Sequence, residues 1–343
     1  MKSLLIRCEA TAALGTGHVL RCLALAQEWM RRGGRVVFAM AEPEPVIVAR
    51  LEAGGGRVVG LRTASGSAAD AFETAALAQR LGAGWLVVDG PLFGPAWEAA
   101  WSGVVRVLRI DDNGLARPFR ADLLLNQNLG AGGADYPAKA GACQLLLGPE
   151  FALLRPEFLR AARARPVRSA RIVVTLGGTD PACATERVLE ALQCPAAREL
   201  AADLIVGAAN PRRIELVAAI TALAPRLQPV VAPGELAERF AGAQLAVTAG
   251  GTTLYELALL CTPMLVLCTA ENQRRTCERF AAVGAVQYAG WHADIAPAEL
   301  AAMVAGLVAD ARKRAILAEL ASQFVDGHGA ARVVEAMIAE GGL

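Results

Sequence analysis

Residues 14–22, "LGTGHVLRC", place a histidine directly after a glycine turn, at the point where a helix is expected to begin. His18, in the first helical turn, would lie near the positive end of the helix dipole, which disfavours the imidazolium form. A neutral imidazole can accept a proton, so His18 is a candidate general base. The residues alone leave two alternatives open, a catalytic base and a histidine that only packs at a helix start.

The turn before His18 is also a candidate anion site. Gly15, Thr16 and Gly17 allow a sharp turn from strand to helix and leave backbone amides accessible. The stretch matches neither the dinucleotide-binding nor the Walker A pattern, so nucleotide recognition cannot rest on it.

A second glycine turn, "TLGGTDP", directly follows an apolar run. Gly177 and Gly178 would stand at the carboxyl end of a strand, where the backbone can approach a ligand closely. We expect Thr179 or Asp180 to cap the next helix, with Pro181 as its first residue. An ordinary strand-to-helix turn explains this stretch equally well.

The most specific stretch is "TAGGTTLYELALLCTPMLVLCTAENQ", residues 248–273. Its strand ends at Gly250 and Gly251, and Thr252 and Thr253 then open a helix, where amides and hydroxyls suit a diphosphate. Glu256, one turn further, is placed to accept hydrogen bonds from the two hydroxyls of a ribose.

Pro263 is expected to start the next strand of this stretch, and Asn272 and Gln273 follow that strand on a loop. Their amides are suited to hydrogen bonds with sugar hydroxyls. An ordinary turn with a buried helix explains the glycines but not polar residues at the ends of both strands.

Weaker candidates complete the set. Asp111 and Asp112 in "RIDDN" end a strand and have the chemistry for metal binding or acid–base work, although a simple turn is favoured. Asn126 in "NQN" is expected to line the site. His292 and His328 are expected in surface loops or turns.

The elements that must position these residues alternate along the whole chain. Helical stretches such as 19–32, with apolar residues on one face, separate short apolar runs, which predicts parallel sheets covered on both faces. The apolar runs typical of strands are residues 3–7, 35–40, 57–61, 85–89, 104–111, 122–127, 171–178, 203–210, 227–233, 244–251 and 263–270.

We interpret the chain as an α/β protein with two doubly wound, Rossmann-like domains facing a cleft. The expected boundaries are residues 1–150 for an amino-terminal domain with the base and 151–170 for an arginine-rich linker. Residues 171–325 would form the nucleotide-binding domain, and 326–343 a final amphipathic helix able to pack on either domain.

The composition excludes several function classes. The net charge of +1, from 34 basic and 33 acidic residues, gives no field for nucleic-acid binding. No uninterrupted apolar stretch is long enough to span a membrane, and the first residues lack a signal-peptide pattern. Eight scattered cysteines form no C-x-x-C motif. We expect a cytoplasmic protein without stable membrane association, and the oligomeric state stays open.

Taken together, "GTGHVLRCLALA", "LLLNQN", "LLGPEFALLRPEF", "TLGGTDP", "AGGTTLYEL" and "AENQ" resemble the bacterial PseG family over nearly the whole chain. These enzymes are UDP-2,4-diacetamido-2,4,6-trideoxy-β-L-altropyranose hydrolases of pseudaminic acid synthesis, which serves flagellin glycosylation. The chain is more distantly similar to the glycosyltransferase MurG. The resemblance implies a GT-B fold, a UDP-sugar between the domains, and inverting hydrolysis at the anomeric carbon without a metal or cofactor.

The resemblance also implies roles for particular residues, carried over position by position. His18 would be the base, with Gly15, Thr16, Gly17, Arg7, Glu9, Asn126, Asn272 and Gln273 at the sugar. UDP would contact Gly177, Gly178, Thr179, Gly250, Gly251, Thr252, Thr253 and Glu256.

Two stretches depart from the family pattern. Arg7, Glu9 and Thr11 replace arginine-x-aspartate-x-serine, and "DGP" at residues 89–91 replaces aspartate-histidine-tyrosine. A tyrosine for the sugar is therefore missing, although Phe93 and Trp97 lie nearby in sequence. The alternatives to the hydrolase are a MurG-like UDP-sugar glycosyltransferase and a non-catalytic nucleotide-sugar-binding protein.

Overall fold

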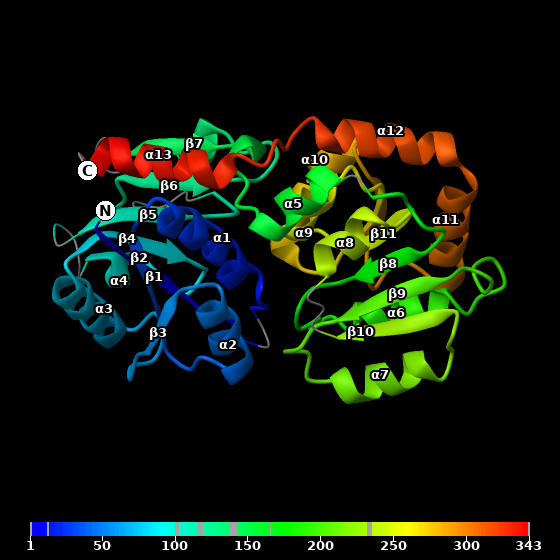
Figure 1. The fold of residues 1–343 in the computed structure, drawn as a ribbon, viewed down its shortest axis with the longest axis horizontal. Coiled ribbons are helices and arrows are strands. Elements are labelled where there is room, and N and C mark those ends of the chain that lie inside the picture. Colours follow the sequence, from blue (N-terminus) through cyan, green and yellow to red (C-terminus); the bar gives the residue numbers. More distant parts are fainter. Residues whose placement is uncertain are drawn as a thin grey trace. The chain divides into compact units, whose positions relative to one another are not determined.

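The computed structural model describes residues 2–11, 14–99, 103, 105–114, 119–136, 143–164, 166–231 and 235–341. The chain divides into two units of similar size, shown in Figure 1. Unit 1 comprises residues 1–155 and 327–343, and unit 2 comprises residues 156–326. Within the described residues, no helix is both long and apolar enough to cross a membrane.

Unit 1 is a doubly wound parallel sheet. Its seven described strands pair in the order β3-β2-β1-β4-β5-β6-β7. The strands are β1 (Ser3–Cys8), β2 (Arg35–Met40), β3 (Arg57–Gly60), β4 (Ala83–Asp89), β5 (Arg106–Ile110), β6 (Leu123–Asn126) and β7 (Gln144–Leu147). The helices are α1 (Gly17–Arg31), α2 (Pro45–Ala53), α3 (Ala68–Leu81), α4 (Pro95–Ala99) and α13 (Gly329–Gly341).

Unit 2 repeats the arrangement. Its six described strands, also parallel, pair in the order β10-β9-β8-β11-β12-β13. The strands are β8 (Ile172–Thr175), β9 (Ala202–Val206), β10 (Leu227–Val231), β11 (Leu245–Ala249), β12 (Met264–Cys268) and β13 (Gln287–Trp291). The helices are α5 (Pro156–Ala164), α6 (Ala184–Ala191), α7 (Arg213–Thr221), α8 (Leu236–Ala241), α9 (Thr253–Leu259), α10 (Arg274–Ala282), α11 (Pro297–Ala309) and α12 (Ala311–Ser322).

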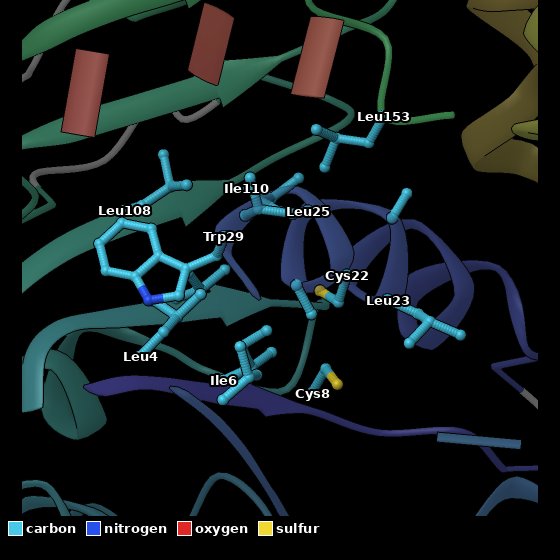
Figure 2. Packing of buried hydrophobic residues seen from close by; sticks show 14 of the residues in the cluster. Leu4, Ile6, Cys8, Cys22, Leu23, Leu25, Trp29, Leu108, Ile110 and Leu153 are labelled. Atoms are coloured by element: carbon cyan, nitrogen blue, oxygen red, sulfur yellow. The ribbon is translucent and has the colours of Figure 1, made fainter. Parts of the chain in front are cut away.

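Helix α1 packs its apolar face on the sheet of unit 1. Figure 2 shows Leu25 and Trp29 of this helix against Leu4 and Ile6 of β1 and Leu108 of β5. All five are fully buried. Burying one such aliphatic side chain contributes about 1.5–3 kcal/mol, so this contact fixes the position of α1 and of the histidine at its start.

The carboxyl-terminal helix α13 belongs to unit 1. Val333 and Met337 are buried in the same cluster as α1. The backbone of Gly329 approaches that of Ala152 so closely that a Cβ would lie 2.2 Å from the Ala152 carbonyl oxygen. The sequence left the choice of domain open, and this close approach decides it.

The expected linker is only partly a linker. Helix α5 occupies its middle and packs within unit 2, where the rings of Phe158 and Phe240 lie 5.8 Å apart. Further along, Arg168 donates to the carbonyls of Ala243 and Cys261 at 2.8 and 2.6 Å. The chain therefore divides at Arg155, and the arginines after it include structural hydrogen-bond donors.

Candidate functional site

The strand order of unit 1 reverses between β1 and β4. The chain adds β2 and β3 on one side of β1, and it adds β4 to β7 on the other side. Ligands in such sheets bind beyond the carboxyl ends of strands at this switch point. Cys8, the last residue of β1, is in register with Asp89, the last residue of β4. The loop after β1 leads to His18 at the start of α1, so the switch point brings His18 to Asp89.

His18 and Asp89 form a hydrogen-bonded pair. Nδ1 of His18 lies 2.9 Å from Oδ1 of Asp89, with the carboxylate fully buried and the imidazole 14% exposed. The imidazole is therefore partly accessible to solvent. Asp89 stood in the sequence only as part of a departure from the family pattern, and the structure makes it the partner of the proposed base.

Arg21, one turn after His18 on α1, bridges two carboxylates. Its Nε and Nη2 donate to Asp89 at 2.7 and 2.6 Å, and its Nη1 and Nη2 donate to Asp112 at 2.6 and 2.9 Å. Asn128, after β6, donates to Asp112 at 3.1 Å. The cluster thus draws on the carboxyl ends of β4, β5 and β6 as well as α1.

Arg21 keeps Asp89 ionised. Burial by itself raises the pKa of Asp89, but the attraction of Arg21 and of His18 outweighs it and holds that pKa well below its usual range. The same balance of burial against Arg21 lowers the pKa of Asp112. Both carboxylates are therefore hydrogen-bond acceptors at neutral pH.

The ionisation of Asp89 decides the tautomer of His18. A carboxylate can only accept, so the 2.9 Å contact requires a proton on Nδ1. Nη2 of Arg21 also lies 3.2 Å from Nδ1, but this is a donor beside a donor, because both groups donate to the same Asp89 oxygen. Nε2 of His18 is then the nitrogen that can take up a proton.

Asp111 and Asn126 belong to a separate, buried network. Tyr136 donates to Oδ2 of Asp111 at 2.8 Å and accepts from Nδ2 of Asn126 at 2.7 Å, while the Gly114 amide donates to Asp111 at 2.6 Å. Asn126 is 1% exposed. The sequence placed Asn126 at the substrate, but the structure places its side chain inside unit 1.

Arg7 and Glu9 are also buried inside unit 1. Arg7 forms two 3.0 Å hydrogen bonds with Asp70 of α3 and one of 2.5 Å with Glu9. Glu9 also accepts from the Ala41 amide and from Ser65. These residues were expected to bind substrate, but their polar atoms hold the end of β1 to α3 and to the loops after β2 and β3.

The two aromatic residues near the missing tyrosine do not replace it. Phe93 and Trp97 are buried with their rings 4.7 Å apart, and Trp97 donates to Asp70 at 3.0 Å. Arg7 lies over the Phe93 ring at 4.9 Å. Both aromatic residues support the buried Arg7 network.

The turn before His18 is tight, as its glycines predicted. Gly15 has φ 75°, a conformation that favours glycine, and its amide donates to the Thr11 carbonyl at 2.9 Å. Thr16 occupies the N-cap position of α1 without a side-chain cap hydrogen bond, and Gly17 is the first helical residue. These residues position His18, and their expected contact with substrate stays a prediction.

Unit 2 has its own switch point, between β8 and β11. The glycine turns predicted to bind UDP follow these two neighbouring strands, which brings Gly177 and Gly178 to the same sheet edge as Gly250 and Gly251. The backbone is tightly packed at this edge. A Cβ added to Gly207, in the loop after β9, would lie 1.9 Å from the Gly178 carbonyl oxygen.

Asp180 caps the helix after β8, although that helix starts later than expected. Its carboxylate accepts from the amides of Ala184 and Thr185, both at 2.9 Å. Helix α6 begins at Ala184, and Pro181 lies in the turn before it. Thr179 is 3% exposed and its hydroxyl has no hydrogen-bond partner within the described structure.

Gln273 fastens the second glycine turn. Its Oε1 accepts from the Gly250 amide at 3.2 Å and from the amide and hydroxyl of Thr269 at 3.2 and 3.0 Å. A Cβ added to Gly250 would lie 2.2 Å from Sγ of Cys277, which is a residue of α10. The turn therefore also packs against α10. The Gln273 side-chain oxygen therefore holds the glycine turn after β11, and the expected contact of Gln273 with sugar stays a prediction.

The other unit 2 candidates lie around the same edge. Thr252 and Thr253 are half-buried at the start of α9, Glu256 is buried within its first turn, and Asn272 is exposed on a 3₁₀ turn. Their roles in binding UDP and sugar stay predictions.

His292 and His328 lie outside the cluster formed by His18, Asp89, Arg21 and Asp112. His292 belongs to unit 2 and its amide donates to the Cys268 carbonyl at 2.9 Å. Burial and the nearby Arg187 lower the pKa of His292. The carbonyl of His328 accepts from the Arg332 amide in the first turn of α13.

Sequence reasoning missed Arg21, Asp89 and Asn128 as members of the cluster and left Asp112 as a turn residue. One signal was available. Arg21 lies three residues after His18, on the same side of a helix, and the carboxylates end apolar runs that a parallel sheet brings to one edge. The pairing itself depends on strand order, which the sequence does not display.

No group of three histidine, cysteine, aspartate or glutamate side chains in the described residues is arranged to hold a metal ion. The two carboxylates that would be the natural oxygen ligands at this edge, Asp89 and Asp112, share Arg21 as their cation.

Solved structures with the same fold are known. Two doubly wound parallel sheets with these strand orders are the GT-B arrangement of many glycosyltransferases. The match with MurG of Acinetobacter baumannii covers 99% of this chain and 100% of MurG, with a TM-score of 0.66 and 14% identity. The match with HepE of Anabaena, which was solved with UDP-glucose, covers 99% of this chain and 100% of HepE, with a TM-score of 0.65 and 14% identity. These similarities establish the fold.

A more specific similarity is to the spore coat polysaccharide biosynthesis protein SpsG of Bacillus subtilis (strain 168). The two chains are 28% identical over 196 residues. The match spans 56% of this chain and 58% of the length of SpsG. No family model matches the chain.

Proposed function

We propose that this protein is a UDP-sugar hydrolase in which His18 is the general base. The observation that carries the proposal is the buried Asp89 carboxylate on Nδ1 of His18, which leaves Nε2 to accept a proton. A base fixed in this way can remove a proton from water as the water attacks a carbon.

Unit 2 is proposed to hold the nucleotide. Its glycine turns converge at the switch point between β8 and β11, with Thr252 and Thr253 at the start of α9 and Glu256 one turn later. The structural similarity to HepE, which was solved with UDP-glucose and with UDP, supports this assignment.

In the proposed reaction, the water oxygen forms a bond to the anomeric carbon as its proton passes to Nε2 of His18. The bond between that carbon and the diphosphate oxygen breaks, and UDP leaves with the electron pair. Diphosphate is a good leaving group, so backbone amides that stabilise its charge can replace a protein acid. A single displacement inverts the anomeric configuration. The sugar is proposed to be a 2,4-diacetamido-2,4,6-trideoxyhexose of nonulosonate synthesis.

A glycosyltransferase is the second candidate. It is favoured by the similarity to MurG and by the polysaccharide biosynthesis relative SpsG. The same His18–Asp89 pair would then remove a proton from an acceptor hydroxyl rather than from water.

Incubation with UDP-2,4-diacetamido-2,4,6-trideoxyhexoses of several configurations, in ¹⁸O-water and without an acceptor, separates the candidates. The hydrolase releases UDP and a free sugar with ¹⁸O at C1, and NMR shows the inverted anomer first. Turnover is expected to survive EDTA, because Asp89 and Asp112 both pair with Arg21 instead of being left free for a metal ion. UDP release only when a hydroxyl acceptor is added would establish the transferase. Binding of UDP-sugar without turnover under either condition would reject both.

A further inference from the structure

We propose that Arg21 is a positioning residue that tunes the His18–Asp89 pair, with Asp112 as the counter-charge that sets how strongly it acts. This inference rests on the proposed function for its catalytic consequence. The electrostatic arrangement itself, however, can be tested without any turnover.

The geometry gives Arg21 little freedom. Four hydrogen bonds between 2.6 and 2.9 Å tie its guanidinium to Asp89 on one side and Asp112 on the other, and the side chain is 4% exposed. Such a bidentate fork fixes the plane of the Asp89 carboxylate. The carboxylate in turn sets the angle at which Nε2 of His18 faces its substrate.

The charges around the imidazole follow from the elements that pack on it. Within the described part of unit 1, α1 provides Arg21 and the Cys22 thiol, which donates to Asp89 at 3.4 Å, and β1 provides Cys8. The end of β4 provides Asp89, and the loop after β5 provides Asp112.

Other charged side chains on and beside β1 and β5 pair outside this cluster. Arg109 of β5 donates to the Gly90 carbonyl at 3.2 Å and pairs with Glu98 of α4. Arg7 and Glu9 neutralise one another beside Asp70. With a neutral His18, the cluster of Arg21, Asp89 and Asp112 carries one net negative charge.

Replacing Arg21 and replacing Asp112 should each shift the proton affinity of His18, and the two shifts should have opposite directions. Arg21→Met leaves two uncompensated carboxylates, which favours the imidazolium. Asp112→Asn leaves Arg21 with Asp89 alone, which disfavours it. Loss of packing or of local order cannot produce this reversal of sign.

The decisive measurement is the titration of His18 by NMR of ¹⁵N-histidine protein. The chain has only three histidines, and His292→Gln and His328→Gln variants assign the other two. We expect the titration midpoint of His18 to rise by about one pH unit in Arg21→Met and to fall in Asp112→Asn. The Nδ1–H tautomer should dominate the neutral form of the unchanged protein.

Arg171→Met is the matched control, since Arg171 pairs with Asp203 in unit 2. It should leave the His18 titration unchanged. Arg21→Lys keeps the charge and provides a second variant if Arg21→Met fails to fold. Its midpoint should stay near that of the unchanged protein, while kcat falls because the fork is lost.

Shifts in the same direction in both variants, or no shift in either, would overturn the inference. With an active substrate, the acidic limb of the kcat/KM profile should move with the NMR midpoint. If His18→Asn retains full turnover, the proposed function fails, whereas the NMR titrations still test the role of Arg21.

Discussion

Nδ1 of His18 lies 2.9 Å from Oδ1 of Asp89, although the two residues are 71 positions apart in the chain. The contact exists because β1 and β4 are neighbours at the switch point of the sheet, with α1 starting directly above their ends. It fixes the tautomer of a histidine at a helix start and leaves its Nε2 able to accept a proton.

Replacing His18 by asparagine tests the base. The asparagine amide can still donate to Asp89, so the surrounding cluster should stay intact. We expect kcat to fall by about two to four orders of magnitude, the usual loss for a missing general base. UDP binding, measured by calorimetry, should change less than about threefold, since the nucleotide is proposed to bind unit 2. Turnover within tenfold of the unchanged protein would remove His18 from the mechanism.

Asp89→Asn tests the tautomer. The amide group can donate to Nδ1, which favours the proton on Nε2 and abolishes its ability to act as a base. We expect kcat to fall by about 10²–10⁴-fold with little change in nucleotide affinity. Asp122→Asn is the matched control, because Asp122 caps the amino-terminal edge of the same sheet by accepting from the Val107 amide. Equal losses in the two variants would indicate a structural effect only.

The ion pair of Asp112 with Arg21 should make the stability of the protein depend on pH in the acid range. Its pKa is lowered in the folded state, so its ion pair contributes stability above the unfolded value of about 3.9. That contribution is lost as the pH falls through the lower folded value. Urea unfolding at pH 7, 5 and 3.5 should therefore show a shallower acid loss in Asp112→Asn than in the unchanged protein. A steeper loss in the variant would contradict the ion-pair assignment.

Gly207→Ala tests the tight packing against the glycine turn after β8, which is proposed to bind UDP. A Cβ at this position would lie 1.9 Å from the Gly178 carbonyl oxygen, so the turn must move. We expect a stability cost of about 1–3 kcal/mol and at least a tenfold loss of UDP affinity. Gly306→Ala in α11 is the control, since nothing lies within 4 Å of its Cβ. It should be neutral or slightly stabilising, because alanine is favoured in helices. Unchanged UDP binding in Gly207→Ala would separate this turn from the nucleotide.

Gly250→Ala tests the second turn by rescue. The new methyl group would lie 2.2 Å from Sγ of Cys277 and 3.0 Å from Cβ of Gln273. We expect reduced melting temperature and UDP affinity, with partial recovery in the Gly250→Ala/Cys277→Ala double variant. A favourable coupling energy in the double-mutant cycle would show that the sulfur is the obstacle. Strictly additive effects would place the strain elsewhere.

The sequence by itself determined the features that depend on local chemistry. Alternating apolar runs and amphipathic helices predicted two parallel α/β sheets, because buried strands and helices have distinct periods. Glycines after strands predicted the turns at Gly15, Gly177 and Gly250, and the helix start after Gly17 placed His18. The edge strands β7 and β13 were not among the predicted strands, whereas the edge strands β3 and β10 were.

Only the tertiary structure decided which polar groups meet. Asp89 and Asp112 lie 68 and 91 residues from Arg21, and their contact depends on the order β1-β4-β5 within the sheet. Arg7 was expected at the substrate because of the family resemblance, yet Asp70, 63 residues away, holds it inside unit 1. Local sequence specifies the elements and their ends, whereas the neighbours of a buried charge are set by how the strands are ordered.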